Sequence, residues 1–233
     1  MVDFHSHFLF DVDDGAKDIE MSLAMLNMSS KQGVTTIVST PHYYADAAKP
    51  HVAAAARDEN IEELIAYAKQ ENVKIPEIKR GFEVRVQKHL YEIENFDELC
   101  IENTNTIMLE MPLKEWNEEL LDVIEFVKTE KKRNIVIAHF ERYLDRISNE
   151  LLLKLLEMDL YIQINAGSLV KRDKLDFICE LFRKDMAHVV GSDAHNMNSR
   201  CSLMDIGYAY IRRNLGQEYI DKIEANAKKL LNL

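Results

Sequence analysis

The sequence predicts an α/β protein whose seven strands and intervening helices form a distorted (β/α)7 barrel, similar to a TIM barrel. Three observations predict it. Short apolar β-rich runs recur seven times, segments with helical spacing lie between them, and six of the runs end in imidazole or carboxylate side chains. In a barrel the carboxyl ends of the strands converge on one mouth, so His5 and His195 become neighbours. A doubly wound open sheet is the alternative, and it would spread these side chains apart.

The individual elements follow from the spacing of apolar residues. Strands are expected at residues 2–5, 35–40, 77–82, 106–111, 134–138, 160–165 and 188–192. Helical spacing is found in three further groups of residues: Ile19, Leu23 and Leu26; Leu120, Ile124 and Val127; and Ile220, Ile223, Ala227 and Leu230. With 7 glycines, 4 prolines and no low-complexity stretch, nothing marks a linker. Residues 1–233 are therefore expected to form a single domain.

Composition limits the possible function classes. The 29 Lys and Arg residues against 40 Asp and Glu residues give a formal net charge of −11, which argues against a basic surface for nucleic acid. No apolar run approaches the roughly 20 residues that a membrane-spanning helix needs, and a cytoplasmic protein is expected. The three cysteines, Cys100, Cys179 and Cys201, are too widely spaced to predict a disulfide framework or a zinc–cysteine cluster.

Closely spaced metal-binding residue types stand at both ends of the chain. In His5-x-His7 the alternation of an extended strand puts both imidazoles on one side, where they can bind one cation. Asp193-x-His195 repeats the pattern. With the other strand ends, the predicted ligands are His5, His7, His42, Glu83, Glu110, His139, Asp193 and His195. This set exceeds the needs of one ion, so two or three are expected, and imidazole with carboxylate suits Mn, Fe or Zn.

The predicted ligands also have structural alternatives. His139 alone would more often be a buried core histidine, whereas Glu110 follows a buried run in which an unpaired carboxylate is costly. Asp14 is the residue of the acidic segment 11–15 that we predict as a ligand, although this segment also fits a turn before a helix. Three further histidines are assigned no chemistry: His51, His89 and His188.

Two ions that share a bridging carboxylate such as Glu83 can clamp a phosphoryl group, whose remaining oxygens need planar donors. Arg142 and Arg200 lie in the right loops to supply them. The alternative for each is a surface arginine paired with a carboxylate, such as Glu141. Aromatic residues of the same loops are candidates for walls around a flat substrate ring, some of them only for packing: Phe8, Phe10, Tyr43, Tyr44, Trp116 and Tyr143.

Five motifs carry a family resemblance. They occur in this order over the whole chain: Phe4-His5-Ser6-His7, Asp11-Val12-Asp13-Asp14-Gly15, Ser39-Thr40-Pro41-His42, His139-Phe140-Glu141-Arg142-Tyr143 and Ser192-Asp193-Ala194-His195-Asn196. Together they resemble the PHP (polymerase and histidinol phosphatase) family. Within it they look most like the manganese-dependent protein-tyrosine phosphatases of capsular and exopolysaccharide operons in Gram-positive bacteria, the CpsB/YwqE type. The chain departs from that pattern at Ala16 and at Cys201-Ser202, where prolines would be expected.

The resemblance implies the PHP fold, up to three ions and the ligand set given above, with Asp14 at or next to the third ion. It also implies that Arg142 and Arg200 bind phosphate, that manganese is the metal, and that the substrate is the phosphorylated tyrosine-rich tail of a bacterial tyrosine kinase. A hydroxide bridging two ions is expected to attack the phosphorus, and His42 or a metal-bound water to protonate the leaving tyrosyl oxygen. Neither nucleic-acid binding nor membrane insertion is expected.

Three other functions stay open at this point. A histidinol-phosphate or other small-molecule phosphomonoesterase of the same family would share all the ligands and differ in its loops. A phosphodiesterase acting on nucleic-acid ends is disfavoured by the charge of −11. A non-catalytic scaffold is disfavoured because a complete ligand set places unpaired charges side by side.

Overall fold

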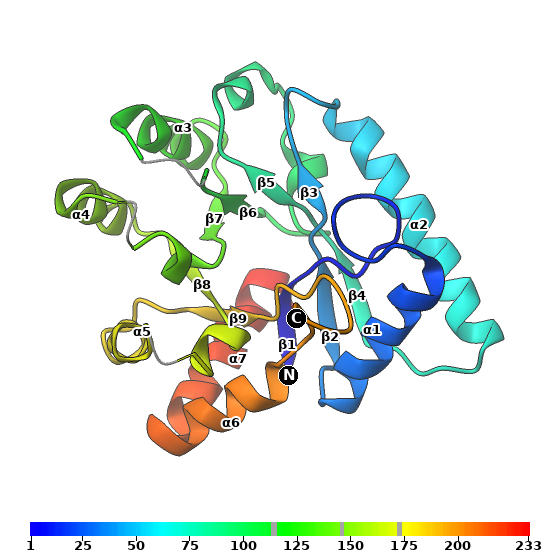
Figure 1. The fold of residues 1–233 in the computed structure, drawn as a ribbon. Helices are drawn as coiled ribbons and strands as arrows, with labels where there is room; N and C mark the ends of the chain where they lie inside the picture. The colour runs from blue at the N-terminus through cyan, green and yellow to red at the C-terminus, as the bar shows by residue number, and fades with distance from the viewer. Residues whose placement is uncertain (113–115, 145–146, 172–173) are drawn as a thin grey trace.

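The computed structural model describes residues 1–112, 116–144, 147–171 and 174–233 (Figure 1). Its strands are β1 (Val2–Ser6), β2 (Thr36–Ser39), β3 (His42–Tyr43), β4 (Glu77–Arg80), β5 (Glu83–Arg85), β6 (Thr106–Glu110), β7 (Asn134–Ile137), β8 (Tyr161–Asn165) and β9 (Val189–Gly191). All their pairings are parallel, in the orders β1-β2-β4 and β3-β5-β6-β7-β8-β9. Every predicted strand is thus confirmed, and the second and third are each continued, after a short interruption, by a further strand beyond the predicted end.

The divisions lie at Pro41 and at Gly81, and the chain continues in the same direction past each of them. Proline has no N–H to donate, which interrupts the ladder after β2. Main-chain hydrogen bonds still cross the interruption, because Gly81 N–H donates to Ser39 O at 2.9 Å and Glu83 N–H donates to Pro41 O at 3.0 Å. β2 with β3, and β4 with β5, therefore each occupy one strand position, which gives seven positions in all.

The curled sheet returns to its first strand. Ser6 and Ala194 form a parallel bridge, Asp193 N–H donates to His5 O at 2.8 Å, and His7 N–H donates to Ala194 O at 2.9 Å. Gly191 permits this approach, because a Cβ there would lie 2.5 Å from the Cβ of His5. The predicted barrel is confirmed over the open sheet, with the last strand joined to the first at its carboxyl end.

Helices surround the strands (Figure 1). They are α1 (Ile19–Lys31), α2 (Pro50–Gln70), α3 (Glu118–Thr129), α4 (Asn149–Glu157), α5 (Leu175–Arg183), α6 (Met204–Asn214) and α7 (Gln217–Leu231), with short 3-10 helices η1 (Lys88–Glu92), η2 (Asp97–Leu99), η3 (Phe140–Arg142) and η4 (Ala166–Leu169). The three helices predicted from spacing are confirmed as α1, α3 and α7. Asp18 and Asn117 cap α1 and α3, accepting from the main-chain N–H groups of Met21 and Leu120. In the described ranges, no helix has the length and apolarity needed to cross a membrane.

The inside of the barrel divides into an apolar floor and a polar mouth. One buried cluster joins residues of five strands to α7: Val2, Phe4, Val38, Met108, Val136, Ala138, Val189, Ala227, Leu230 and Leu231. The Thr106 hydroxyl donates to Leu230 O at 2.9 Å, which fixes α7 across the amino ends of the strands. Glu110 lies two residues beyond Met108 on the same face of β6. The strand periodicity that fills the floor thus also places charged side chains in the mouth.

Candidate metal centre

All nine predicted ligand positions meet at the carboxyl ends of the strands. Donor atoms within 4.8 Å of one another form three groups: His7, Asp14, His42 and His195; His5, His7 and Asp193; and His42, Glu83 and Glu110. The remaining one, His139, lies directly after β7, and its Nε2 is 2.7 Å from Glu83 Oε1. Residues from six strand positions and from the β1–α1 loop therefore share one cavity. Their role as ligands stays a prediction.

Glu83 occupies the centre of this cavity. Its Oε2 atom is 3.4 Å from His5 Nε2, 3.2 Å from His7 Nε2 and 3.1 Å from His42 Nδ1. The same atom is buried and has no hydrogen bond among the residues that the structure describes. A carboxylate oxygen that faces three imidazole nitrogens in this way is placed as a bridging ligand would be.

The geometry of the histidine pair at the N-terminus fits a cation. His7 Nδ1 lies 2.7 Å from Asp13 Oδ2, so that nitrogen carries a proton and Nε2 is left as the ligating atom. His7 Nε2 lies 3.0 Å from His5 Nε2. Asp193 Oδ1 is 3.7 Å from both Nε2 atoms. Two imidazoles and a carboxylate aimed at one point fit a divalent cation.

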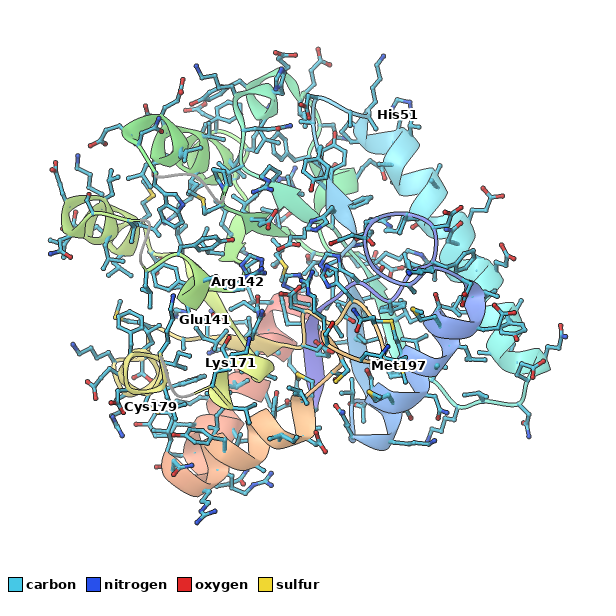
Figure 2. All side chains as sticks on the ribbon, in the orientation of Figure 1. His51, Glu141, Arg142, Lys171, Cys179 and Met197 are labelled. Atoms are coloured by element: carbon cyan, nitrogen blue, oxygen red, sulfur yellow. The ribbon has the colours of Figure 1, made fainter. Side chains whose placement is uncertain are left out.

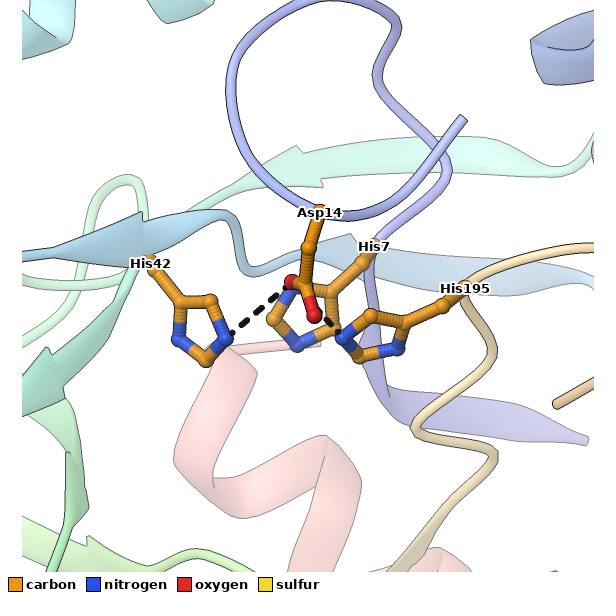
Figure 3. Close-up of side chains that lie close together, drawn as sticks. All are labelled: His7, Asp14, His42 and His195. Atoms are coloured by element: carbon orange, nitrogen blue, oxygen red, sulfur yellow. Dashed lines mark ion pairs between the residues drawn. The ribbon is translucent and has the colours of Figure 1, made fainter. Parts of the chain in front are cut away.

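A second group, of His7, Asp14, His42 and His195, shares His7 with the first (Figure 3). Asp14 Oδ1 is 3.4 Å from His42 Nε2 and 3.2 Å from His195 Nε2, and these are the ion pairs drawn there. The Asp14 side chain is 61% exposed, whereas that of His195 is 2% exposed. Asp14 thus extends from the β1–α1 loop over imidazoles that are rooted in the barrel. Of the three acids in its segment, it is the one whose carboxylate lies beside two imidazole rings.

Arg142 and Arg200 overhang the mouth from two different loops. Arg142, at the end of η3 beside Glu141 (Figure 2), donates from Nη1 to Asp193 Oδ2 at 3.1 Å. Arg200 donates from Nη2 to Asp193 Oδ1 at 3.0 Å, and its Nη1 lies 3.6 Å from Asp14 Oδ2. Both side chains keep more than a third of their surface exposed. Both arginines are paired with a carboxylate, but it is that of Asp193, a predicted ligand, whereas the alternative interpretation named Glu141.

Two of the strand-end candidates have left-handed backbone conformations. His139 has φ 33° and Asp193 has φ 50°. Non-glycine residues in this region cost on the order of 1 kcal/mol or more, and they concentrate at functional sites. The turn at His139 begins η3, with Arg142 N–H donating to His139 O at 2.9 Å. Each conformation turns the chain at the end of a strand and brings the following arginine loop back over the mouth.

Protons balance the charges in this cavity when no cation is bound. Burial alone would lower the pKa of His7, but the neighbouring carboxylates of Asp13 and Glu83 raise it to about 10. Burial and the neighbouring His7 lower the pKa of His195 to about 3. Burial, together with the negative charge of Glu83, raises the pKa of Glu110. Cation binding would displace the proton from His7, so proton release should accompany metal uptake.

Comparison with known proteins identifies the chain. The family model for capsular polysaccharide synthesis, CpsB/CapC, matches residues 1–232. The chain belongs to the CpsB/CapC family. Tyrosine-protein phosphatase CpsB of Streptococcus pneumoniae is 31% identical over 93% of this chain and 91% of its own length. Tyrosine-protein phosphatase YwqE of Bacillus subtilis is 30% identical over 99% of this chain and 91% of its own length.

Solved structures agree with this assignment to the CpsB/CapC family. A structure described as belonging to YwqE from Bacillus subtilis and CpsB from Streptococcus pneumoniae, unique metal-dependent tyrosine phosphatases, superimposes with a TM-score of 0.87. It has 27% identity over 100% of this chain and 94% of that one. The phosphotriesterase homology protein of Escherichia coli matches with a TM-score of 0.61 at 12% identity over 99% and 98% of the two chains, which shows a shared fold.

Sequence reasoning missed several residues around the centre of this CpsB/CapC member. Asp13 orients His7, Gln163 and Asn165 of β8 contact candidate ligands, and Arg85 Nε lies 3.3 Å from Glu110 Oε2. Alternation along the strand was the available signal, because Arg85 follows Glu83 by two residues and Asn165 follows Gln163 by two. Amides and arginine are not usual metal ligands, so this signal does not by itself predict a role in a metal centre.

The predicted aromatic walls are mostly packing. Four of the six aromatic side chains are buried in the core: Phe8, Tyr43, Trp116 and Tyr143. Phe10 is half-buried, and Tyr44 is 38% exposed, with its ring centroid 5.8 Å from that of His42. Among the described aromatics of these loops, Tyr44 is therefore the one that offers an accessible face beside the predicted ligands. His51, His89 and His188 lie outside the three ligand groups, as expected.

Proposed function

We propose that this chain is a metal-dependent protein-tyrosine phosphatase, a phosphoric monoester hydrolase that removes phosphate from tyrosine side chains of proteins. Membership of the CpsB/CapC family and the names of its relatives support the activity. The observation that carries the proposal is the position of Glu83 Oε2, within 3.1–3.4 Å of three imidazole nitrogens and without a hydrogen bond among the described residues. This geometry supports a multinuclear metal centre, which suits phosphoester hydrolysis.

The three groups of side chains divide the ligand roles among them. His5, His7 and Asp193 would hold one cation, Glu83, Glu110 and His139 a second, and Asp14, His42 and His195 a third, because the one free nitrogen of His7 can bind a single cation. When bound, divalent ions supply positive charge that polarises phosphoryl oxygens and acidifies water. We propose manganese as the metal, as the family resemblance implies; imidazoles and carboxylates without a thiolate also suit iron and zinc, which are the alternatives to be tested.

The arginines would bind the phosphate oxygens that project out of the cavity. Both guanidinium groups are held by opposite oxygens of Asp193, at 3.1 and 3.0 Å, while more than a third of each side chain faces solvent. This arrangement fixes two forked donors on one rim before substrate arrives, so little ordering is left to be done on binding. Arg142 and Arg200 therefore align the phosphorus above the cavity and neutralise charge that develops on its oxygens.

The leaving tyrosyl oxygen needs little assistance, because the free phenol has a pKa near 10. His42 is the mouth histidine nearest to solvent, with 18% of its side chain exposed. Its two ring nitrogens face Asp14 at 3.4 Å and Glu83 at 3.1 Å. Both are thus committed to carboxylates, and we propose that His42 serves chiefly as a ligand. Tyr44, beside it, would border the substrate ring.

The substrate we propose is the phosphorylated tyrosine-rich tail of a bacterial tyrosine kinase that acts in capsular or exopolysaccharide synthesis. The capsular polysaccharide description of the family supports this choice. Since both partners are acidic and this chain carries a net charge of −11, long-range attraction cannot bring them together. Recognition would instead depend on the local positive charge of the metal centre and the two arginines.

The test compares a phosphotyrosyl peptide with histidinol phosphate on protein loaded in turn with manganese, iron and zinc. We expect manganese-dependent release of phosphate from the peptide, and much slower turnover of histidinol phosphate. Preference for histidinol phosphate would instead assign the small-molecule phosphomonoesterase activity. Failure to hydrolyse either substrate, at full metal occupancy, would refute the proposal.

A further inference from the structure

Strand β8 carries none of the predicted ligands, and yet two of its side chains lie among them. Gln163 is fully buried and Asn165 is 9% exposed, and both are on the face of β8 that looks into the mouth. β8 lies between β7, which leads to His139, and β9, which leads to Asp193 (Figure 1). The proposed hydrolysis gives these two amides no role, so their role must follow from the groups to which they are hydrogen-bonded.

Their hydrogen bonds fix the orientation of both amides. The main-chain N–H of His139 donates to the Gln163 side chain at 2.7 Å, and a backbone N–H can only donate. The accepting atom is therefore the oxygen Oε1, and Nε2 of Gln163 donates to Asn165 Oδ1 at 2.8 Å. Asn165 must then present its nitrogen to Asp193, and Nδ2 donates to Asp193 Oδ2 at 2.8 Å. The chain of donors runs in one direction, from Gln163 to Asp193.

The same orientation decides the tautomer of His5. Gln163 Oε1, already identified as an acceptor, lies 3.1 Å from His5 Nδ1. That nitrogen must therefore carry the proton, which leaves the lone pair of a neutral ring on Nε2. His5 Nε2 is the atom that faces His7 Nε2 at 3.0 Å and Glu83 Oε2 at 3.4 Å. With the opposite orientation of the amide, the lone pair would point away from the centre.

We propose that Gln163 and Asn165 form an amide relay that orients His5 and Asp193 for cation binding, without touching cation or substrate themselves. The proposal rests on the metal centre proposed above. A fixed His5 tautomer presents a lone pair, and a fixed Asp193 carboxylate presents Oδ1 to the same point, 3.7 Å from His5 Nε2. Buried Glu141 holds the backbone of Asn165 in place. Its Oε1 accepts from the main-chain N–H of Asn165 at 3.2 Å and from the Ser168 hydroxyl at 2.7 Å. Gln163 and Asn165 are thus positioning residues.

Three variants separate the steps of the relay. Gln163→Met keeps the length of the side chain and removes both its acceptor and its donor. Gln163→Glu keeps an acceptor for His5 Nδ1 and for His139 N–H, but turns an oxygen towards Asn165 Oδ1. Asn165→Ala removes the donor to Asp193 and leaves Gln163 in place. Tyr208→Phe is the matched control, because it removes a buried hydrogen bond of 2.6 Å, to Glu224, between α6 and α7.

The measurement is the affinity for Mn2+ by titration calorimetry, with the melting temperature of the chelator-treated protein recorded beside it. We expect Gln163→Met and Asn165→Ala to weaken Mn2+ binding by about 10–100-fold, as loss of groups that orient ligands does. Gln163→Glu should reduce Mn2+ affinity by a smaller factor, because the glutamate oxygen still fixes the His5 tautomer. Tyr208→Phe should lower the melting temperature and leave Mn2+ affinity unchanged.

The outcomes distinguish the relay from the activity. Wild-type affinity in both Gln163→Met and Asn165→Ala would overturn the relay while leaving the phosphatase proposal intact. If Gln163→Met fails to fold, Asn165→Ala decides alone, because it makes a smaller change at a less buried position. A wild-type protein that binds no Mn2+ would overturn the relay and the metal centre together.

Discussion

Asp13 was not predicted as a site residue, and the structure makes it a sensitive position for testing the centre. Its Oδ2 atom accepts from His7 Nδ1 at 2.7 Å and from the main-chain N–H of His42 at 3.0 Å, while Oδ1 accepts from Gly15 N–H at 2.8 Å. Burial would raise the pKa of Asp13, but these partners lower it from 3.8 to about 2. At about 1.4 kcal/mol per pKa unit, this lowering corresponds to about 2 kcal/mol of stability.

The pH dependence of this stability follows from the lowered pKa of Asp13. A carboxyl whose pKa is lower in the folded state contributes its full stability above about pH 4, and the contribution disappears as the pH falls through about 2. In Asp13→Asn the free energy of unfolding of the metal-free protein should therefore fall by about 2 kcal/mol at pH 7, with a smaller difference below pH 4. For a chain of this length the melting temperature should fall by about 4–8 °C. Mn2+ affinity should fall by about 10–100-fold, because His7 is no longer oriented by a charge.

Thermal unfolding of chelator-treated protein between pH 3 and pH 8, together with Mn2+ titration at pH 7, measures both effects. Asp11→Asn is the control, since Asp11 is an exposed acid of the same loop and its side chain makes no hydrogen bond or ion pair with the described residues. Asparagine also suits its left-handed backbone, at φ 55°. Equal melting temperatures and equal Mn2+ affinities for Asp13→Asn and the wild type would refute the role assigned to Asp13.

Three further predictions follow from the site and the barrel closure. Gly191→Ala would place a Cβ 2.5 Å from the Cβ of His5, so it should displace β1 or β9 and abolish tight Mn2+ binding. Normal Mn2+ binding would show that β1 and β9 can move apart without disturbing the ligands. Arg142→Ala should lower turnover of a phosphotyrosyl peptide by about 10²–10³-fold at unchanged metal content, and Arg142→Lys should not restore it because the forked donor is lost; recovery by lysine would mean that charge alone is needed. When free metal at 100 times its dissociation constant is removed with a chelator, the free energy of unfolding should fall by about 2.7 kcal/mol, and the melting temperature should fall with it. An unchanged melting temperature would contradict a centre that forms only in the folded state.

Periodicity was enough to predict the strands because a parallel barrel buries both faces of each strand. The stretches 107–109 and 135–138 are therefore apolar throughout, and each is followed directly by a predicted ligand, Glu110 or His139. The interruptions at Pro41 and Gly81 were not predicted. They depend on how three neighbouring strands bend past one another, which local preference does not specify.

The sequence by itself determined which strand ends carry imidazoles and carboxylates, because one rule of barrel geometry places all such ends in one mouth. It also favoured Asp14, which lies beside two histidines, as the acid that reaches them. Both results follow from residue type and from position relative to a strand end.

Only the tertiary structure decided how these side chains are oriented. The role of Asp13, the direction of the amides of Gln163 and Asn165, and the pairing of both arginines with Asp193 depend on distances of about 3 Å between residues far apart in the chain. Hydrogen bonds are directional and short-ranged, so a shift of one ångström or a turn of one rotamer removes them. Sequence patterns specify which face and which end a residue occupies, and the packing of the whole barrel specifies what it touches.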